Sequence, residues 1–311
     1  MPSPEPAFPR LAAAQGAGFL AVALLGLGFQ LWLPRVLPSP ADDRAVGEVL
    51  GREARPGDVV ILQPWWTERA RLFLPPGLAV VGYFGDEGDA LDEHPRVWVL
   101  SQPRLPFSRE SDFWRAFLPG RTRLAAERRL GPYRLDLYGN GRARPVRFSA
   151  AEALGAASAA VDLPGQPPVA CVHEGAGFRC PGGVRVEASL HEVLYQPSRC
   201  LFIVPPGGPG SVEVTLPGVP PADRLRFEAA IVWEHAWKHR PELTPLNAQL
   251  SDATTGAPLA SLVVPPGTEG FVGTDVPGGP DRLRLRVQSD NAHERETCIR
   301  LRALGPSGES R

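Results

Sequence analysis

Closely spaced histidines and acidic residues are the first candidates for chemistry in this sequence. His235 and His239 lie four residues apart, a spacing that would place two metal ligands on one face of a helix. The strand-like alternation before them favours a strand end instead, which would separate the pair. An acidic cluster at residues 86–93 could hold a hard cation, but its spacing differs from that of a calcium loop. We therefore predict no metal site and no cofactor.

No catalytic motif stands out either. The chain has no Gly-x-Ser-x-Gly nucleophile turn, and its His191-Glu192 pair is not followed by the second histidine of a zinc protease. Paired carboxylates for glycosidic cleavage are defined by their separation in space, which a sequence does not state. We therefore assign no catalytic residue.

Tryptophans are the strongest remaining candidates for ligand contact. Trp65 and Trp66 follow Pro64 at the end of an apolar run that is typical of a buried strand, a position where α/β sheets form clefts. Trp237 lies beside the histidine pair. Indole rings can stack on sugars or anchor a protein partner, and core packing is the alternative for each of them. We predict Trp65, Trp66 and Trp237 as ligand-binding residues.

The four cysteines all lie in the C-terminal half of the chain. Cys171 and Cys180 bracket a short segment with two glycines, so that two short strands could bring their sulfurs together. Cys200 and Cys298 would then form the second disulfide, although four cysteines permit three connectivities and unrelated thiols are the alternative. The even number favours disulfides and hence an oxidising compartment.

A long apolar segment at the N-terminus determines where this half of the chain is located relative to a membrane. Residues 11–33 carry no charge, and as a helix they would span roughly 30 Å, the thickness of a bilayer core. We predict a short tail at residues 1–10 and a transmembrane helix at residues 11–34. A cleaved signal peptide, with Ser39 and Ala41 before the cut, is the alternative. Arg10 and Arg35 nearly balance, so charge alone does not orient the helix.

Composition excludes some classes of partner. The 311 residues carry a net charge of −1, and the positive charge is scattered and almost all arginine, with Lys238 the only lysine. The chain therefore has no overall positive charge that would attract nucleic acid, and the arginine bias indicates a GC-rich bacterial source. With 43% hydrophobic residues, the chain has ample material for two domains beyond the anchor.

Residues 41–140 alternate between helix and strand patterns, which predicts a small α/β domain. We expect a helix over residues 44–53 capped by Asp42 or Asp43, and further helices over residues 67–74 and 108–118. Strands are expected at residues 58–62, 78–81, 96–100 and 133–138.

The first part of the chain resembles a known family. The Arg-Pro-Gly-Asp-Val-Val-Ile-Leu-Gln-Pro-Trp-Trp run, the following Leu-Pro-Pro-Gly and the later Arg-Val-Trp-Val-Leu-Ser are similar to the soluble portion of bacterial polytopic glycosyltransferases that use lipid-linked sugars. The resemblance covers roughly residues 20–138. It transfers no catalytic residue, because the catalytic acidic residues of that family lie on loops between membrane helices that this sequence lacks.

From residue 146 onward the pattern changes to strict alternation of apolar and polar residues. Leu225, Phe227, Ala229, Ile231 and Trp233 share one face of a strand, and shorter stretches of the same kind follow between Gly/Pro turns. Strands without intervening helices predict an antiparallel, jelly-roll-like β-sandwich at residues 146–305, with a flexible tail at residues 306–311. The run from residue 224 to 303 resembles the later strands of galactose-binding-like jelly rolls.

Together these features predict a single-pass bacterial membrane protein whose C-terminal bulk is extracytoplasmic, either periplasmic or on the cell surface. The expected function is binding of a glycan, a lipid-linked sugar or a protein partner in the cell envelope. The rival hypotheses are a glycosyltransferase-related accessory or remnant enzyme and a hydrolase with an unrecognised site.

Overall fold

The computed structural model describes residues 8–64, 67–82, 91–103, 110–194, 196–232, 243–291 and 295–307. The chain forms two compact units, Met1–Asn140 and Gly141–Arg311. The division falls where the sequence changes from mixed helix and strand patterns to strand alternation alone.

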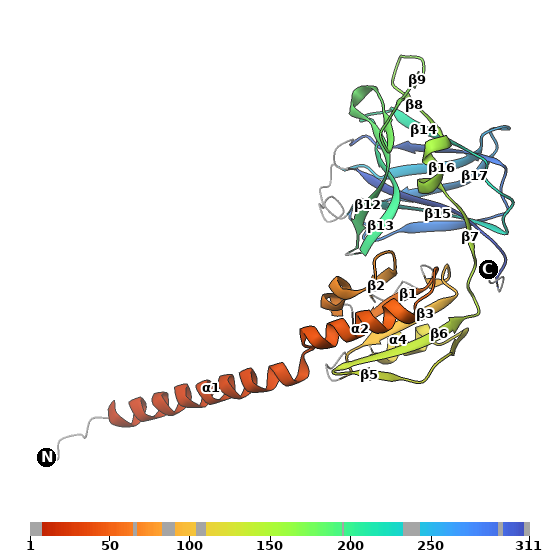
Figure 1. Ribbon diagram of the computed structural model, residues 1–311. Coiled ribbons are helices and arrows are strands. Elements are labelled where there is room, and N and C mark those ends of the chain that lie inside the picture. Colours follow the sequence, from red (N-terminus) through yellow and green to blue (C-terminus); the bar gives the residue numbers. More distant parts are fainter. Residues whose placement is uncertain are drawn as a thin grey trace. The chain divides into compact units, whose positions relative to one another are not determined.

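Helix α1, Phe8–Val36, is the long apolar segment of the first unit (Figure 1). Its side chains from residue 15 to residue 35 are almost all exposed, including large apolar ones such as Phe19 and Leu25. Within the described part of the chain, the structure has one helix long and apolar enough to cross a membrane. A membrane anchor and a signal sequence share these two properties.

Helix α2, Pro40–Glu53, begins earlier than the sequence predicts, and its cap is Ser39. The Asp42 N–H donates to Ser39 Oγ at 3.3 Å, and the Ser39 N–H donates to Asp42 Oδ2 at 2.7 Å. This reciprocal capping box replaces the predicted cap by Asp42 or Asp43. Pro40 fits the first helical turn because its fixed φ suits that position and its missing N–H would have no helical partner there.

The sheet of the first unit is mixed. Its order is β2 (Ala79–Gly82), β1 (Val59–Gln63), β3 (Arg96–Ser101), β6 (Tyr133–Asn140) and β4 (Arg121–Arg123), with β5 (Arg128–Leu130) also on β6. Strand β1 runs parallel to β2 and β3, and β6 runs antiparallel to β3. The sheet is covered on one face by α2 and on the other by α4 (Glu110–Phe117).

Two details of this unit differ from the expected elements. Residues Thr67–Phe73 form a 3-10 helix, η1, where we expected an α-helix. Strands β4 and β5 were not anticipated, because each has three residues, mostly arginine, and therefore shows no apolar alternation.

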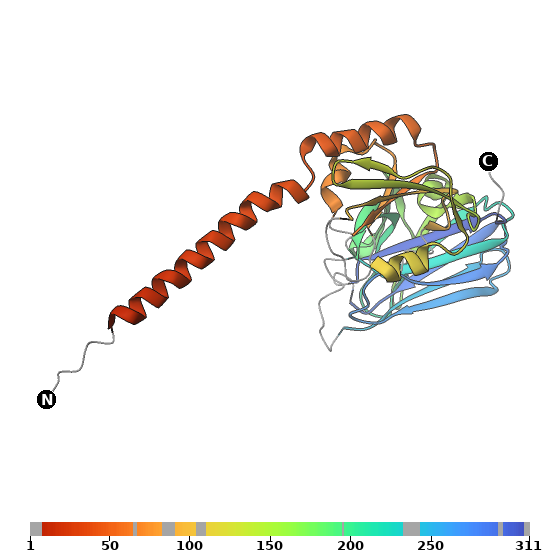
Figure 2. The ribbon, with the colours of Figure 1, turned by 90° about the horizontal axis from the view of Figure 1, so that it is seen from below.

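The second unit is a β-sandwich (Figure 1, Figure 2). The eight-stranded sheet has the order β10-β11-β12-β13-β20-β15-β18, with β7 paired to β20, and the six-stranded sheet has the order β17-β16-β19-β14-β8-β9. The strands are β7 Val146–Ser149, β8 Ser158–Asp162, β9 Val169–Ala170, β10 Val172–Glu174, β11 Gly177–Arg179, β12 Arg185–Val193, β13 Gln196–Val204, β14 Ser211–Pro217, β15 Arg224–Ile231, β16 Leu246–Asp252, β17 Pro258–Val264, β18 Val272–Pro277, β19 Arg282–Gln288 and β20 Thr297–Leu304. The short helices are α5 Ala150–Ala153, η2 Leu154–Ala156 and η3 Pro181–Gly183.

Apolar side chains from both sheets fill the sandwich core. Leu225, Phe227 and Ala229 of β15 are fully buried there, as the alternation predicts, together with Val212 and Val214 of the opposite sheet. The predicted fold class is therefore confirmed: a long apolar helix, a small α/β unit and an antiparallel β-sandwich.

Both disulfides expected from the sequence are present. Cys171–Cys180 closes the hairpin of β10 and β11, with its Cα atoms 4.4 Å apart. Cys200–Cys298 joins neighbouring strands β13 and β20, with its Cα atoms 5.5 Å apart, and both of its residues are buried. All four cysteines therefore stabilise the sandwich.

Candidate functional site

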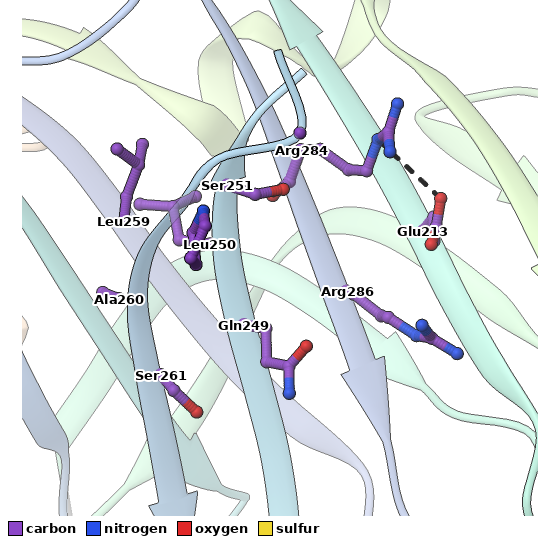
Figure 3. A pocket seen from close by; sticks show the side chains of 11 residues that line it. Glu213, Gln249, Leu250, Ser251, Leu259, Ala260, Ser261, Arg284 and Arg286 are labelled. Carbon is purple, nitrogen blue, oxygen red and sulfur yellow. Dashed lines mark hydrogen bonds and ion pairs between the residues drawn. The ribbon is translucent and has the colours of Figure 1, made fainter. Parts of the chain in front are cut away.

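A hollow of about 460 Å³ lies on the outward face of the six-stranded sheet (Figure 3). We call it the sheet hollow. Strands β14, β16, β17 and β19 and the turn between β16 and β17 form its walls. Its lining residues are Glu213, Gln249, Leu250, Ser251, Gly256, Pro258, Leu259, Ala260, Ser261, Arg284 and Arg286.

The alternation of each strand decides which side chains face the hollow. In β19, Leu283, Leu285 and Val287 pack in the sandwich core, so Arg284 and Arg286 point to the opposite face. Strand β16 follows the same rule: its buried residues Leu246, Ala248 and Leu250 alternate with Asn247, Gln249 and Ser251.

Strand register then brings polar residues from distant parts of the chain into one row. Arg286 of β19 lies opposite Gln249 on one side and opposite Glu213 on the other, and Gln249 lies opposite Ser261 of β17. The row Ser261-Gln249-Arg286-Glu213 crosses four adjacent strands, and neighbouring strands are about 4.8 Å apart.

A turn and a β-bulge supply the apolar wall. The register shifts at Leu250/Ser251, which places Leu259 as the extra residue of β17 beside Pro258. The carboxylate of Asp252 stabilises the turn. Its Oδ1 accepts from the Thr254 N–H at 2.7 Å and from the Thr255 N–H at 3.3 Å, and its Oδ2 accepts from the Thr255 hydroxyl at 2.7 Å. These hydrogen bonds lower the pKa of Asp252, and the one from the Thr255 hydroxyl contributes most. Gly256 takes a φ of +76°, which side chains disfavour.

Two arginines and two carboxylates set the electrostatics of the sheet hollow. Arg284 Nε lies 3.9 Å from Glu213 Oε2, and Arg286 Nη2 lies 3.6 Å from Asp162 Oδ2. Arg286 Nε donates to Ser211 Oγ at 2.9 Å. The side chains of Arg284 and Arg286 are 41% and 40% exposed, and both residues line the hollow, so a ligand there can reach them.

These groups favour a polar ligand of a particular kind. Guanidinium nitrogens only donate hydrogen bonds, a carboxylate only accepts them, and an amide or hydroxyl does both. The apolar wall at Pro258 and Leu259 adds a surface for carbon atoms. The sheet hollow can therefore hold a small molecule that carries many hydroxyl groups and one apolar face.

The sequence-predicted ligand residues Trp65, Trp66 and Trp237 lie outside the described residues, as do His235 and His239. The structure does describe the strand that precedes Trp65 and Trp66. There, at the carboxyl ends of β1 and β3, the side chains of Gln63 and Ser101 are buried and lie in register, at the edge where open α/β sheets bind ligands.

The buried carboxylates Asp43, Asp58 and Asp136 of the first unit form salt bridges with arginines. Asp43, Asp58 and Asp136 are fully or almost fully buried, and each lies 2.8 to 3.1 Å from a guanidinium nitrogen. Burial raises the pKa of Asp136, and the arginines beside it oppose that shift. These contacts stabilise the α/β unit, and we give the three aspartates no catalytic role. Among the described residues, no three His, Cys, Asp or Glu side chains converge as metal ligands would.

Sequence reasoning missed the sheet hollow. The alternation of β19 places its arginines on a polar face, but the partners of that face come from strands far away in the chain. The only local signal is the Arg-x-Arg-x-Arg pattern of Arg282, Arg284 and Arg286, which is also typical of an ordinary solvated strand face.

Comparison with known proteins gives structural matches alone. No protein-family model and no curated protein matches the chain. Tandem CBM51 modules of a family 98 glycoside hydrolase from Streptococcus pneumoniae match 37% of this chain and 35% of their own, at 13% identity and a TM-score of 0.26. A CBM51 domain structure with GlcNAc from Clostridium perfringens matches 43% and 30%, at 10% identity and a TM-score of 0.27.

A family 35 carbohydrate-binding module from Clostridium thermocellum matches 39% of this chain and 89% of its own, at 9% identity and a TM-score of 0.21. The chain thus spans about a third of the length of the CBM51 structures. At these identities and TM-scores, the likenesses assign neither ligand nor activity. None of the three is a glycosyltransferase, so the resemblance of residues 20–138 to that family stays a prediction.

Proposed function

We propose that this chain is a membrane-tethered glycan-binding protein and that the sheet hollow is its binding site. The observation that carries the proposal is the hollow itself, where donors, acceptors and an apolar wall lie together on a rigid sheet. Its volume of about 460 Å³ falls within the range of roughly 300–1,000 Å³ that is usual for small-molecule sites.

Sugars suit this lining better than other small molecules do. Each hydroxyl of a sugar can accept from Arg286 or donate to Glu213, while Gln249 and Ser261 can do either. The C–H face of a sugar ring matches the wall of Pro258 and Leu259. A purely apolar ligand would displace water from the exposed parts of the arginine side chains without offering them a hydrogen bond, at a cost in free energy.

Helix α1 and the two disulfides support the proposed location. The helix is long enough to cross a bilayer, and disulfides persist in oxidising compartments outside the cytoplasm. In this arrangement the sandwich would meet glycans of the cell envelope while α1 holds it at the membrane.

The test is a glycan array probed with the full chain in detergent micelles, followed by titration of any glycan that binds. We expect Gln249→Ala to weaken binding about ten-fold, as the loss of one or two hydrogen bonds would. Gln288→Ala is the matched control, because Gln288 lies on the same face in the next row, outside the lining. Binding that Gln249→Ala leaves unchanged, or an array without any bound glycan, would overturn the proposal.

A further inference from the structure

Each arginine of the sheet hollow lies near a carboxylate. Arg284 and Arg286 of the lining carry positive charge, and Glu213, also in the lining, lies 3.9 Å from Arg284. Asp162, which lies outside the lining, is 3.6 Å from Arg286. The third arginine of β19, Arg282, is exposed and lies outside the lining. An anionic ligand would therefore meet a carboxylate near each of the two guanidiniums.

The separation of these pairs leaves them open to a ligand. Nitrogen-oxygen distances of 3.9 Å and 3.6 Å exceed those of hydrogen bonds, so a ligand that binds these groups does not have to break a direct hydrogen-bonded ion pair. Figure 3 shows Glu213 facing the arginines from the neighbouring strand, with its contact to Arg284 dashed. Both arginines belong to the lining of the hollow.

Donor and acceptor stand side by side in the row that crosses the sheet. Arg286, which only donates, lies directly opposite Glu213, which only accepts. Two adjacent hydroxyl groups of a ligand can hydrogen-bond to both side chains: one accepts from the Arg286 guanidinium while its neighbour donates to the Glu213 carboxylate. A carboxylate ligand would satisfy Arg286 but repel Glu213.

From this arrangement we infer that the sheet hollow selects a neutral sugar with a free vicinal diol, bound across Arg286 and Glu213. The inference rests on the proposed glycan-binding function and adds the class of sugar. Gln249, on the other side of Arg286, supplies a further donor and acceptor for the next hydroxyl along the row.

The experiment compares neutral and acidic sugars on the full chain in detergent micelles. Saturation-transfer NMR titrations would use methyl glycosides of glucose, galactose and mannose, their monodeoxy analogues, and the corresponding uronic acids. We expect at least one neutral hexoside to bind about ten-fold more tightly than its uronic acid. Removal of either hydroxyl of one adjacent pair should weaken that hexoside about ten-fold.

The substitution Glu213→Gln gives the sharpest test, because it removes the negative charge but keeps the size of the side chain. Neutral hexoside binding should weaken, and uronic acid binding should tighten, so that the preference between them narrows or reverses. Glu192→Gln is the control: Glu192 is exposed on β12, in the other sheet, and should change neither affinity.

Two results separate this inference from the function on which it rests. If the native chain prefers uronic acids and Gln249→Ala weakens their binding, the sheet hollow is a glycan site but the neutral-diol inference is wrong. If neutral sugars bind and neither Gln249→Ala nor Glu213→Gln alters their affinity, the hollow is not the site, and both are wrong.

Discussion

At the scale of single residues, the pairing of Asp43 explains how the first unit tolerates a buried charge. Tyr133 Oη donates to Asp43 Oδ1 at 2.7 Å, and Arg69 Nε lies 3.0 Å from Oδ2. Asp43 is fully buried, and burial followed by this hydrogen bond raises the pKa of Tyr133. The tyrosine therefore stays protonated as a donor at ordinary pH.

We expect Tyr133→Phe to destabilise the chain by about 2 kcal/mol, because the substitution removes a donor to a buried carboxylate without changing the shape of the ring. Urea unfolding of the full chain measures the loss. Tyr138→Phe is the control, since the Tyr138 hydroxyl accepts a longer contact, of 3.4 Å, from Arg123. Equal effects of the two substitutions would contradict the role given to the Asp43 contact.

His94 makes the first unit sensitive to pH. Burial lowers the pKa of His94 from its usual 6.5, although the Gly57 carbonyl, which accepts from Nδ1 at 2.9 Å, partly opposes the shift. Well above pH 6.5 the histidine is neutral in both the folded and the unfolded state and adds no pH dependence. Below it the unfolded chain takes up a proton before the folded chain does, so stability falls as pH falls towards the folded pKa.

Stability should therefore decline between pH 6.5 and the lower pKa of His94, and His94→Gln should flatten that part of the profile. Thermal unfolding at half-unit pH steps measures both curves. A native profile that is no steeper than that of His94→Gln over this range would show that the histidine does not titrate as described.

At the scale of elements, the two disulfides act on loops of very different length. Cys171–Cys180 spans a sequence separation of 9, and Cys200–Cys298 spans 98. In the chain-entropy model a longer closed loop restricts the unfolded chain more, and the expected stabilisation is about 2–3 kcal/mol for the short loop and about 4.7 kcal/mol for the long one. The second bond also lies in a buried cluster with Phe202 and Val204.

We expect the Cys200→Ser/Cys298→Ser pair to destabilise the sandwich about 2 kcal/mol more than the Cys171→Ser/Cys180→Ser pair. Denaturant unfolding of the two double variants gives the comparison, and non-reducing peptide mapping checks which bond each variant keeps. The loop argument fails if loss of the hairpin bond costs as much as loss of the long one.

At the scale of the whole molecule, the division at Asn140/Gly141 separates two units with their own cores. The core of the sandwich contains only residues beyond 146, and those of the α/β unit contain none of them. Each unit therefore has the buried apolar residues that independent folding requires.

Residues 146–311 expressed alone, under oxidising conditions, should fold and unfold cooperatively. Circular dichroism should show a β-rich spectrum and one thermal transition. An unfolded spectrum for this piece, alongside a folded full chain, would mean that the sandwich depends on the first unit.

Location is also a property of the whole chain. If α1 is an anchor with the disulfide-bonded sandwich outside the cytoplasm, alkaline phosphatase fused after Arg311 should be active. A fluorescent reporter that folds only in the cytoplasm should stay dark at the same position. The opposite pair of results would place the C-terminal unit in the cytoplasm.

The sequence by itself determined the elements whose cause is local. Residues 11–33 lack charge and form a helix, the alternation at Leu225 to Ile231 forms a strand with its apolar residues in the core, and the spacing of Cys171 and Cys180 matches a hairpin. Each of these patterns predicts its structure directly, because it involves residues that lie close together in the sequence.

The tertiary structure alone decided which residues form the sheet hollow. Glu213, Gln249, Ser261 and Arg286 belong to four strands, and only their register places them in one row. Each strand shows which face is polar but not which strand will lie beside it, because pairing depends on the packing of both sheets around a common core. The candidate site is therefore a product of strand order, and no segment of the sequence contains it.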